Sequence, residues 1–306
     1  MPYLLGAPLF SLGAVAIGMF AVLSHFLSFG HNSLMDTAMG YDNDDPNKKH
    51  HPLVADHSKL REAHNVIQWG LALMVCVFAL ISIFYGINPL YSLLGIVIYV
   101  AFGHAYNDGL SKESQGGFLA ISLCFVGLIL WSFFLSNAEM TGIFALYVVY
   151  TVLTLLFQIS YSGFLKEITV GEQSNVLCKM GAHVDEHGYY HASYAQIYAY
   201  IIKAMTLAIA VIMVLRVVDP LEQLLCGVWL FIMGGLLIKA VSKLCVSREY
   251  KRDKELMNMS IVEIITIFIP IPIMIGFVEA GILMFVCVVY FFAMNKLIWK
   301  ANVPKV

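Results

Sequence analysis

The sequence predicts an all-α, polytopic membrane protein built as a bundle of about nine transmembrane helices. Of its 306 residues, 60% are hydrophobic and only 12% are charged, whereas a soluble domain carries roughly 25% charged residues. The apolar residues form long continuous runs instead of the alternating pattern of a membrane β-strand. Most charged residues lie between these runs, as expected for helices that cross a bilayer.

Nine apolar runs approach the ~20 residues that a helix needs to cross the hydrocarbon core. They lie at residues 6–30, 65–86, 89–106, 117–136, 141–160, 194–215, 221–243, 257–276 and 278–298. The last two runs are continuous, and one helix of about 40 residues would be twice as long as the core is thick. We therefore expect a break at Pro270, Pro272, Gly276 and Gly281, because proline and glycine interrupt helices.

Basic residues gather on one of the two sides that nine spans define. Fifteen of the 18 Lys and Arg residues lie in the polar segments of that side, and the opposite side holds only Arg216. Because cytoplasmic loops are the ones rich in Lys and Arg, this side is predicted to be cytoplasmic. The amino terminus is then external and the carboxyl terminus cytoplasmic.

We expect one transmembrane domain over residues 1–306, with cytoplasmic loops at 31–64, 107–116 and 161–193. The first and third loops are far longer than a minimal bundle needs, and such loops commonly carry function. No basic patch interleaved with aromatic residues indicates nucleic-acid binding. The six cysteines show no CxxC spacing, which argues against a zinc site or a disulfide framework.

The first loop starts with polar residues that continue the helical register of the first span. Asn32 and Asp36 are four residues apart and share a helix face. Asp44 and Lys48 follow within a segment rich in both charges. Carboxylates beside lysines suit a magnesium-bridged diphosphate. A solvated acidic loop is the alternative, although a polar face that begins inside a membrane helix is costly unless it lines a cavity.

This pattern resembles the first motif of the UbiA superfamily of intramembrane prenyltransferases, which reads NxxxDxxxD and is followed by basic residues and an RPL-like tripeptide. Asn32 and Asp36 match its first two positions. Gly40 stands at the third position, and four inserted residues bring Asp44 into that role. The residues that then fall into register are Asn47, Lys48, Pro52 and Leu53, with His51 where arginine is usual.

Two later loops resemble further parts of that family. Residues 158–177 resemble its second carboxylate motif, with glutamates where aspartates are usual, and residues 106–112 resemble its middle loop. From this resemblance, magnesium is expected to be held by Asn32, Asp36, Asp44, Glu167 and Glu172. The expected substrate-binding residues are Lys48, Tyr106, Lys112, Tyr161, Lys166 and Asn175.

The resemblance implies a Mg²⁺-dependent prenyltransferase. It would move a polyprenyl group from its diphosphate to a lipid, aromatic or other acceptor at the cytoplasmic mouth of the bundle, in contact with membrane lipids. The allylic cation formed in such a reaction needs a dry cavity, where rings such as Phe157, Tyr106 or Tyr161 could stabilise it.

Three alternatives stay open at this stage. The glutamates of the second motif are compatible with a non-catalytic, UbiA-like lipid-binding or structural subunit of a membrane complex. A second alternative keeps the family fold but changes the donor, for instance to phosphoribosyl diphosphate, which would react with a polyprenyl phosphate. A transporter is the third alternative, supported by Glu263 and Glu279 within apolar runs.

A separate histidine series invites a metal interpretation. His183, His187 and His191 are spaced by four residues and would line one face of a helix, where they could hold zinc. Gly188 interrupts that helix, so an interfacial segment is the favoured interpretation.

Overall fold

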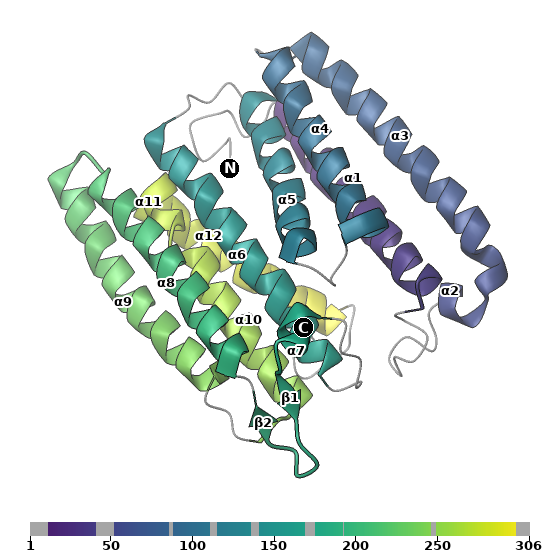
Figure 1. Ribbon diagram of the computed structural model, residues 1–306. Coiled ribbons are helices and arrows are strands. Elements are labelled where there is room, and N and C mark those ends of the chain that lie inside the picture. The colour runs from purple at the N-terminus through teal and green to yellow at the C-terminus, as the bar shows by residue number, and fades with distance from the viewer. Residues whose placement is uncertain are drawn as a thin grey trace. The chain divides into compact units, whose positions relative to one another are not determined.

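The computed structural model describes residues 12–40, 52–85, 88–110, 115–135, 141–168, 175–191, 193–245 and 249–297. Within these ranges the chain is helical apart from one short β-hairpin and the connecting turns, which confirms the all-α class (Figure 1). The chain forms two compact units, Met1–Glu139 and Met140–Val306.

The first unit contains four long helices. They are α1 (Leu12–Ala38), α3 (Leu60–Tyr85), α4 (Pro89–Ala105) and α5 (Gln115–Leu135), with short α2 (Pro52–Ala55), the 3₁₀ turn η2 (His57–Lys59) and the π-helical turn η3 (Tyr106–Leu110). Helix α1 packs on α3, α3 on α4 and α4 on α5. Their core is aromatic: Phe20 contacts Phe78, Tyr99 and Trp131, and its ring centroid lies 4.3 Å from that of Trp131.

Helices α4 and α5 approach each other through glycines. A Cβ added to Gly95 would lie 2.5 Å from the backbone nitrogen of Trp131, and one added to Gly127 would collide with the backbone of Tyr99. Small residues allow such close backbone contact between membrane helices, where lipid supplies no hydrophobic drive for association.

The second unit contains a bundle of four helices followed by two more. They are α6 (Gly142–Glu167), α8 (Ser193–Leu215), α9 (Pro220–Cys245), α10 (Arg252–Phe268), α11 (Ile271–Ile275) and α12 (Phe277–Leu297), with the short α7 (Val176–Lys179) after α6. Helix α6 packs on α8 and α10, and α9 packs on both α8 and α10. One face of α6 is fully buried in this core, including Phe157, Tyr161 and Phe164.

The predicted break near the end of the chain is confirmed. Pro270 and Pro272 stand at the start of α11, which ends after five residues. Gly276 then takes φ +82°, a left-handed conformation that glycine adopts without strain, and α12 begins at the next residue. Gly281 lies within α12 and does not interrupt it.

The histidine series forms a hairpin and not a helix. Strand β1 (His183–Val184) pairs antiparallel with β2 (Tyr190–His191), and Gly188 takes φ +78° in the turn between them. His183 and His191 face each other with stacked rings 4.9 Å apart, whereas His187 lies in the turn. The three histidines therefore do not line one face, and the helical zinc site is not formed.

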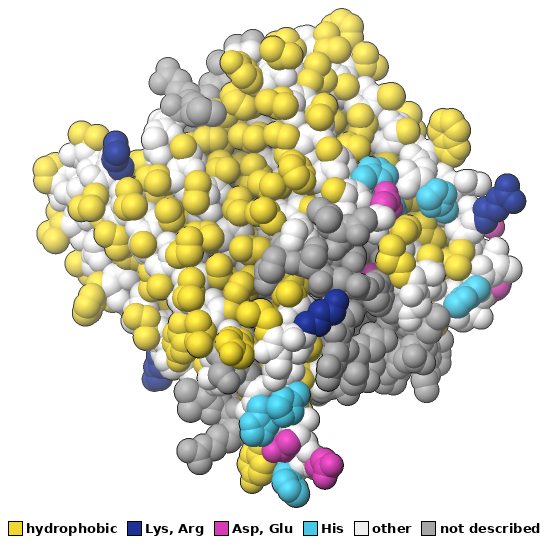
Figure 2. Space-filling view, viewed as in Figure 1, with side chains coloured by type: hydrophobic (Ala, Val, Ile, Leu, Met, Phe, Trp, Pro, Cys, Tyr) yellow, Lys and Arg dark blue, Asp and Glu magenta, His cyan; other side chains and the backbone are white. Residues whose placement is uncertain are grey.

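The outer surface of the helices is apolar. Within the ranges that the structure describes, eight helices are long and apolar enough to cross a membrane. Helix α12, in the position of the ninth predicted span, begins with the shorter apolar stretch Phe277–Val286. Trp69 is 77% exposed and Phe231 is 83% exposed. In water such a surface would aggregate, whereas in a bilayer it faces lipid chains. Figure 2 shows apolar side chains over the helices of the second unit and histidines and carboxylates at the β1–β2 hairpin.

Candidate functional site

The polar face of α1 lies where the sequence predicts it. The helix continues eight residues past the predicted end of the first span, so Asn32 and Asp36 both lie in its last turns. Asn32 Nδ2 donates a hydrogen bond of 2.9 Å to Asp36 Oδ2, and both residues are half-buried. The amide thereby orients the carboxylate. One carboxylate with a neighbouring amide oxygen is a donor set that fits Mg²⁺, which commonly takes one or two carboxylates and completes its shell with phosphates and water.

The middle loop comes against α1 within the same unit. The π-helical turn η3 continues α4 and contacts α1. It carries Tyr106, which is half-buried, and Asn107, whose Nδ2 lies 3.1 Å from Nδ1 of the buried His31. Asp108 in the same turn lies 3.3 Å from His31 Nε2 and 2.8 Å from His104 Nδ1. The structure therefore brings Tyr106 and its neighbours to the end of α1 that carries Asn32.

The expected site residues did not include His31, His104 and Asp108, which the structure brings together beside Asn107. Two signals for them existed in the sequence: His31 directly precedes Asn32, and His104 and Asp108 are four residues apart and can share a helix face. The contact between His31 and Asp108 spans 77 positions of the chain, which no local pattern reveals.

Tyr161 and Asn175, expected to contact substrate, are both fully buried in the second unit. Tyr161 stacks on Phe157 at 5.0 Å, and its hydroxyl lies 3.4 Å from that of Tyr190. Asn175 Oδ1 accepts from the backbone N–H of Leu177 at 2.9 Å and so caps α7. In this conformation the two side chains hold the end of α6 and the segment after it, and neither is exposed to a ligand.

Tyr250, which follows α9 in the chain, links the end of α6 to the β1–β2 hairpin. The hydroxyl of Tyr250 donates to the carbonyl oxygen of Leu165 at 2.5 Å, and the backbone N–H of Tyr250 donates to the carbonyl oxygen of Gly188 at 3.0 Å. Within the hairpin, His191 Nε2 lies 2.9 Å from Asp185 Oδ2. The hydrogen bond from His191 and those from the backbone hold the pKa of Asp185 below its usual range.

The remaining predicted site residues have no described side chains. Lys166 and Glu167 form the last turn of α6, but only their backbone is described. The positions of Asp44, Lys48, Lys112 and Glu172 lie outside the described residues.

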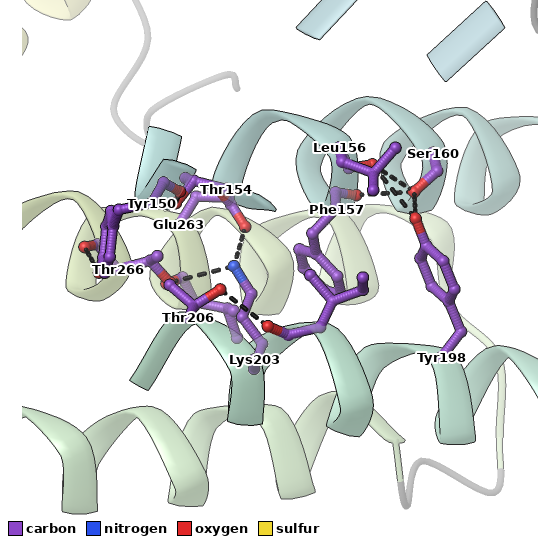
Figure 3. A network of polar contacts seen from close by, with 12 residues as sticks. Tyr150, Thr154, Leu156, Phe157, Ser160, Tyr198, Lys203, Thr206, Glu263 and Thr266 are labelled. Carbon is purple, nitrogen blue, oxygen red and sulfur yellow. Dashed lines mark hydrogen bonds and ion pairs between the residues drawn. The ribbon is translucent and has the colours of Figure 1, made fainter. Parts of the chain in front are cut away.

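A buried ion pair lies inside the membrane-spanning part of the second unit (Figure 3). Lys203 Nζ of α8 donates to Glu263 Oε1 of α10 at 2.8 Å and to Thr266 Oγ1 at 3.1 Å. The two charged side chains are only 4% and 6% exposed. Charges at this depth are costly unless they are paired, and they mark functional positions often enough to be tested.

The ion pair changes the interpretation of two residues. Glu263, which in the sequence supports a transporter, has Lys203 as its direct partner. Phe157, a candidate for stabilising an allylic cation, already has the Lys203 ammonium 4.1 Å from its ring centroid (Figure 3). The lysine ammonium therefore occupies this face of the ring, where an allylic cation would otherwise have to lie.

Comparison with known proteins gives one structural likeness. No family model and no curated protein matches the sequence. The fold is similar to that of a solved structure, the apo form of a UbiA homologue from Aeropyrum pernix K1, with a TM-score of 0.57. The two chains are 15% identical, and the match covers 93% of this chain and 94% of the other. The chain therefore has a UbiA-like fold, as its first motif predicts.

Proposed function

We propose that this UbiA-like chain belongs to the UbiA superfamily and is a Mg²⁺-dependent prenyltransferase. It moves a polyprenyl group from its diphosphate to a lipid, aromatic or other acceptor. The observation that carries the proposal is the coincidence of two independent features. The fold is similar to that of a UbiA homologue over almost the whole chain, and Asn32 and Asp36 form a hydrogen-bonded pair at the motif's own spacing.

In this proposal the first motif binds the metal and the donor's diphosphate. Asn32, Asp36 and Asp44 hold one Mg²⁺, and Glu167 and Glu172 hold a second. When bound, Mg²⁺ stabilises the negative charge of the departing diphosphate. The amide of Asn32 keeps the Asp36 carboxylate oriented before the metal arrives, which reduces the reorganisation that binding requires.

The remaining predicted residues divide into two groups by their surroundings. Lys48, Lys112 and Lys166 neutralise phosphate charge, and Tyr106 contacts the donor from the π-helical turn. Tyr161 and Asn175 are positioning residues, because both are fully buried and hold the end of α6, where Lys166 and Glu167 lie.

The proposed orientation follows the distribution of basic residues. The ends of α1 and α4 and the start of α3 lie on the Lys- and Arg-rich side, which we propose is cytoplasmic. The amino terminus is then external and the carboxyl terminus cytoplasmic. The donor and its magnesium meet the protein from the cytoplasm.

Calorimetric titration of the protein in lipid nanodiscs tests the proposed site without requiring an acceptor. The ligand is a non-cleavable prenyl diphosphate analogue, added with and without Mg²⁺. We expect saturable, Mg²⁺-dependent binding that is weakened at least tenfold in Asp36→Asn. Glu62→Gln is the matched control, because Glu62 is an exposed carboxylate of the same unit.

The same titration separates the proposal from its main rival. A non-catalytic relative need not bind magnesium diphosphate, so a silent titration with intact protein contradicts the proposal. Binding that is equal in Asp36→Asn and the wild type contradicts the assignment of the metal to the first motif.

A further inference from the structure

We propose that His31, His104 and Asp108 form a binding site for a first-row divalent transition metal, with Zn²⁺ as the expected ion, separate from the magnesium site. The three side chains each offer one ligand atom, and these atoms lie within 4.8 Å of one another. Two imidazole nitrogens and one carboxylate are a known ligand set for Zn²⁺ and for related metals that prefer nitrogen. We refer to these residues as the His–His–Asp site.

The local structure brings these three residues together from two helices. His104 belongs to the last turn of α4, and the π-helical turn that follows carries Asp108. His31 comes from α1 and is buried, whereas the side chain of Asp108 is 47% exposed. The site thus has a fixed inner ligand and an outer face that an ion can reach.

The contacts around His31 are compatible with a lone pair on its Nε2. A neutral imidazole has only one nitrogen that accepts a hydrogen bond. The NH₂ groups of Asn107 and Gln68 nevertheless lie 3.1 Å from Nδ1 and 3.4 Å from Nε2 of this single ring. If the ring is neutral, one of the two amides must present its oxygen, and the oxygen and nitrogen of an amide are assigned from the hydrogen-bond network.

Asn107 is the amide to rotate. It is 7% exposed, and its Oδ1 is a buried oxygen with no hydrogen-bond partner within the described ranges. A half-turn of the amide lets this oxygen accept from His31 Nδ1–H. The lone pair of His31 then lies on Nε2, the atom 3.3 Å from the Asp108 carboxylate.

In this rotated arrangement the lone pair on Nε2 and the carboxylate repel each other unless a cation lies between them. A metal ion removes the repulsion, and the Asn107 oxygen orients the histidine ligand through its other nitrogen, as outer partners of metal sites commonly do. His104 Nδ1, 2.8 Å from the same carboxylate, supplies the third ligand. Three protein ligands leave a further position open for water or a substrate oxygen.

Titration of chelator-treated protein with Co²⁺, in lipid nanodiscs and without any prenyl diphosphate, tests the site. Co²⁺ reports its ligands through visible absorption. We expect one Co²⁺ per chain, displaced by Zn²⁺ but not by millimolar Mg²⁺, because Mg²⁺ prefers oxygen ligands. Binding should weaken at least tenfold in His104→Ala and in Asp108→Asn, and about 10–100-fold in Asn107→Ala, which removes the orienting amide but no metal ligand.

Two controls separate this result from the proposed magnesium site. His187→Ala removes an exposed histidine of the hairpin turn, and Asp36→Ala removes a carboxylate of the first motif; both should bind Co²⁺ as the wild type does. Failure of prenyl diphosphate binding leaves this prediction unaffected, since no donor is present.

The proposal is overturned by three results. The first is the absence of a cobalt spectrum in the wild type, which would mean that a proton on His31 bridges it to Asp108. The second is cobalt binding that is unchanged in His104→Ala and Asp108→Asn. The third is displacement by millimolar Mg²⁺, which would assign the bound ion to oxygen ligands.

Discussion

Removing one partner of the Lys203–Glu263 pair should destabilise the protein far more than removing both. The two charged atoms lie 2.8 Å apart in the core of the second unit. At an effective dielectric constant of ~20, two unit charges at this distance attract each other by about 6 kcal/mol. This attraction offsets the cost of placing each charge away from water. Lys203→Met therefore leaves a buried carboxylate that has neither water nor the lysine ammonium to stabilise its charge.

The expected magnitudes follow from this balance. Lys203→Met and Glu263→Met should each lower the free energy of unfolding by about 3–5 kcal/mol. Lys203→Met also removes the hydrogen bond to Thr266 and the contact with Phe157. The double variant replaces the pair with apolar side chains of similar length, and it should cost less than either single change. The coupling free energy is then several kcal/mol.

Reversible unfolding in mixed detergent micelles measures the four free energies of this double-mutant cycle. Single effects that add within about 0.5 kcal/mol would contradict this prediction, because they would mean that the charges do not interact. The double variant should also bind a prenyl diphosphate analogue like the wild type. Loss of binding in a stable double variant would show that the pair serves function as well as folding.

Three further predictions concern other parts of the chain. Gly127→Ala should lower the free energy of unfolding by about 1–3 kcal/mol, because the added Cβ meets backbone of α4, whereas Gly18→Ala, in open space, should not. The pKa of Asp185, measured by NMR, should lie below its ordinary 3.8 and should rise toward that value in His191→Ala. Because the pKa is lowered in the folded state, the contact stabilises the hairpin above pH 3.8, and this stabilisation is lost as pH falls through the lowered pKa. Asn175→Ala should cost about 1 kcal/mol and speed amide exchange in α7, since it removes the cap; unchanged exchange would contradict that role.

Hydropathy and helix breakers predicted most of the fold. The apolar runs and the Pro270–Gly276 break were enough to place the nine long helices of the described residues, because a bilayer permits few other structures. The predicted ends were less accurate where polar residues continue a helix. Helix α1 extends to Ala38 and α6 to Glu167, since Asn32, Asp36 and the residues after 160 keep the helical register beyond the ends of the predicted apolar runs.

Contacts within the candidate site could be predicted only where its residues are close in sequence. The Asn32–Asp36 contact follows from helical periodicity. The contacts of His31 with the π-helical turn, and of Lys203 with Glu263, join segments 60 or more residues apart. Such pairs depend on which helix faces pack together, and local patterns in a single sequence do not reveal that packing. The burial of Tyr161 has the same cause, since it depends on packing against Tyr190.

The proposed prenyltransferase activity is tested by measuring diphosphate release by the purified protein in lipid nanodiscs. The assay uses prenyl diphosphates of several lengths with lipid, aromatic and other candidate acceptors, with and without Mg²⁺. We expect release from at least one donor that requires Mg²⁺, is abolished in Asp36→Ala and persists in Glu62→Gln. Release that is undiminished in Asp36→Ala would contradict it, as would silence with every donor and acceptor in protein that also fails to bind the diphosphate.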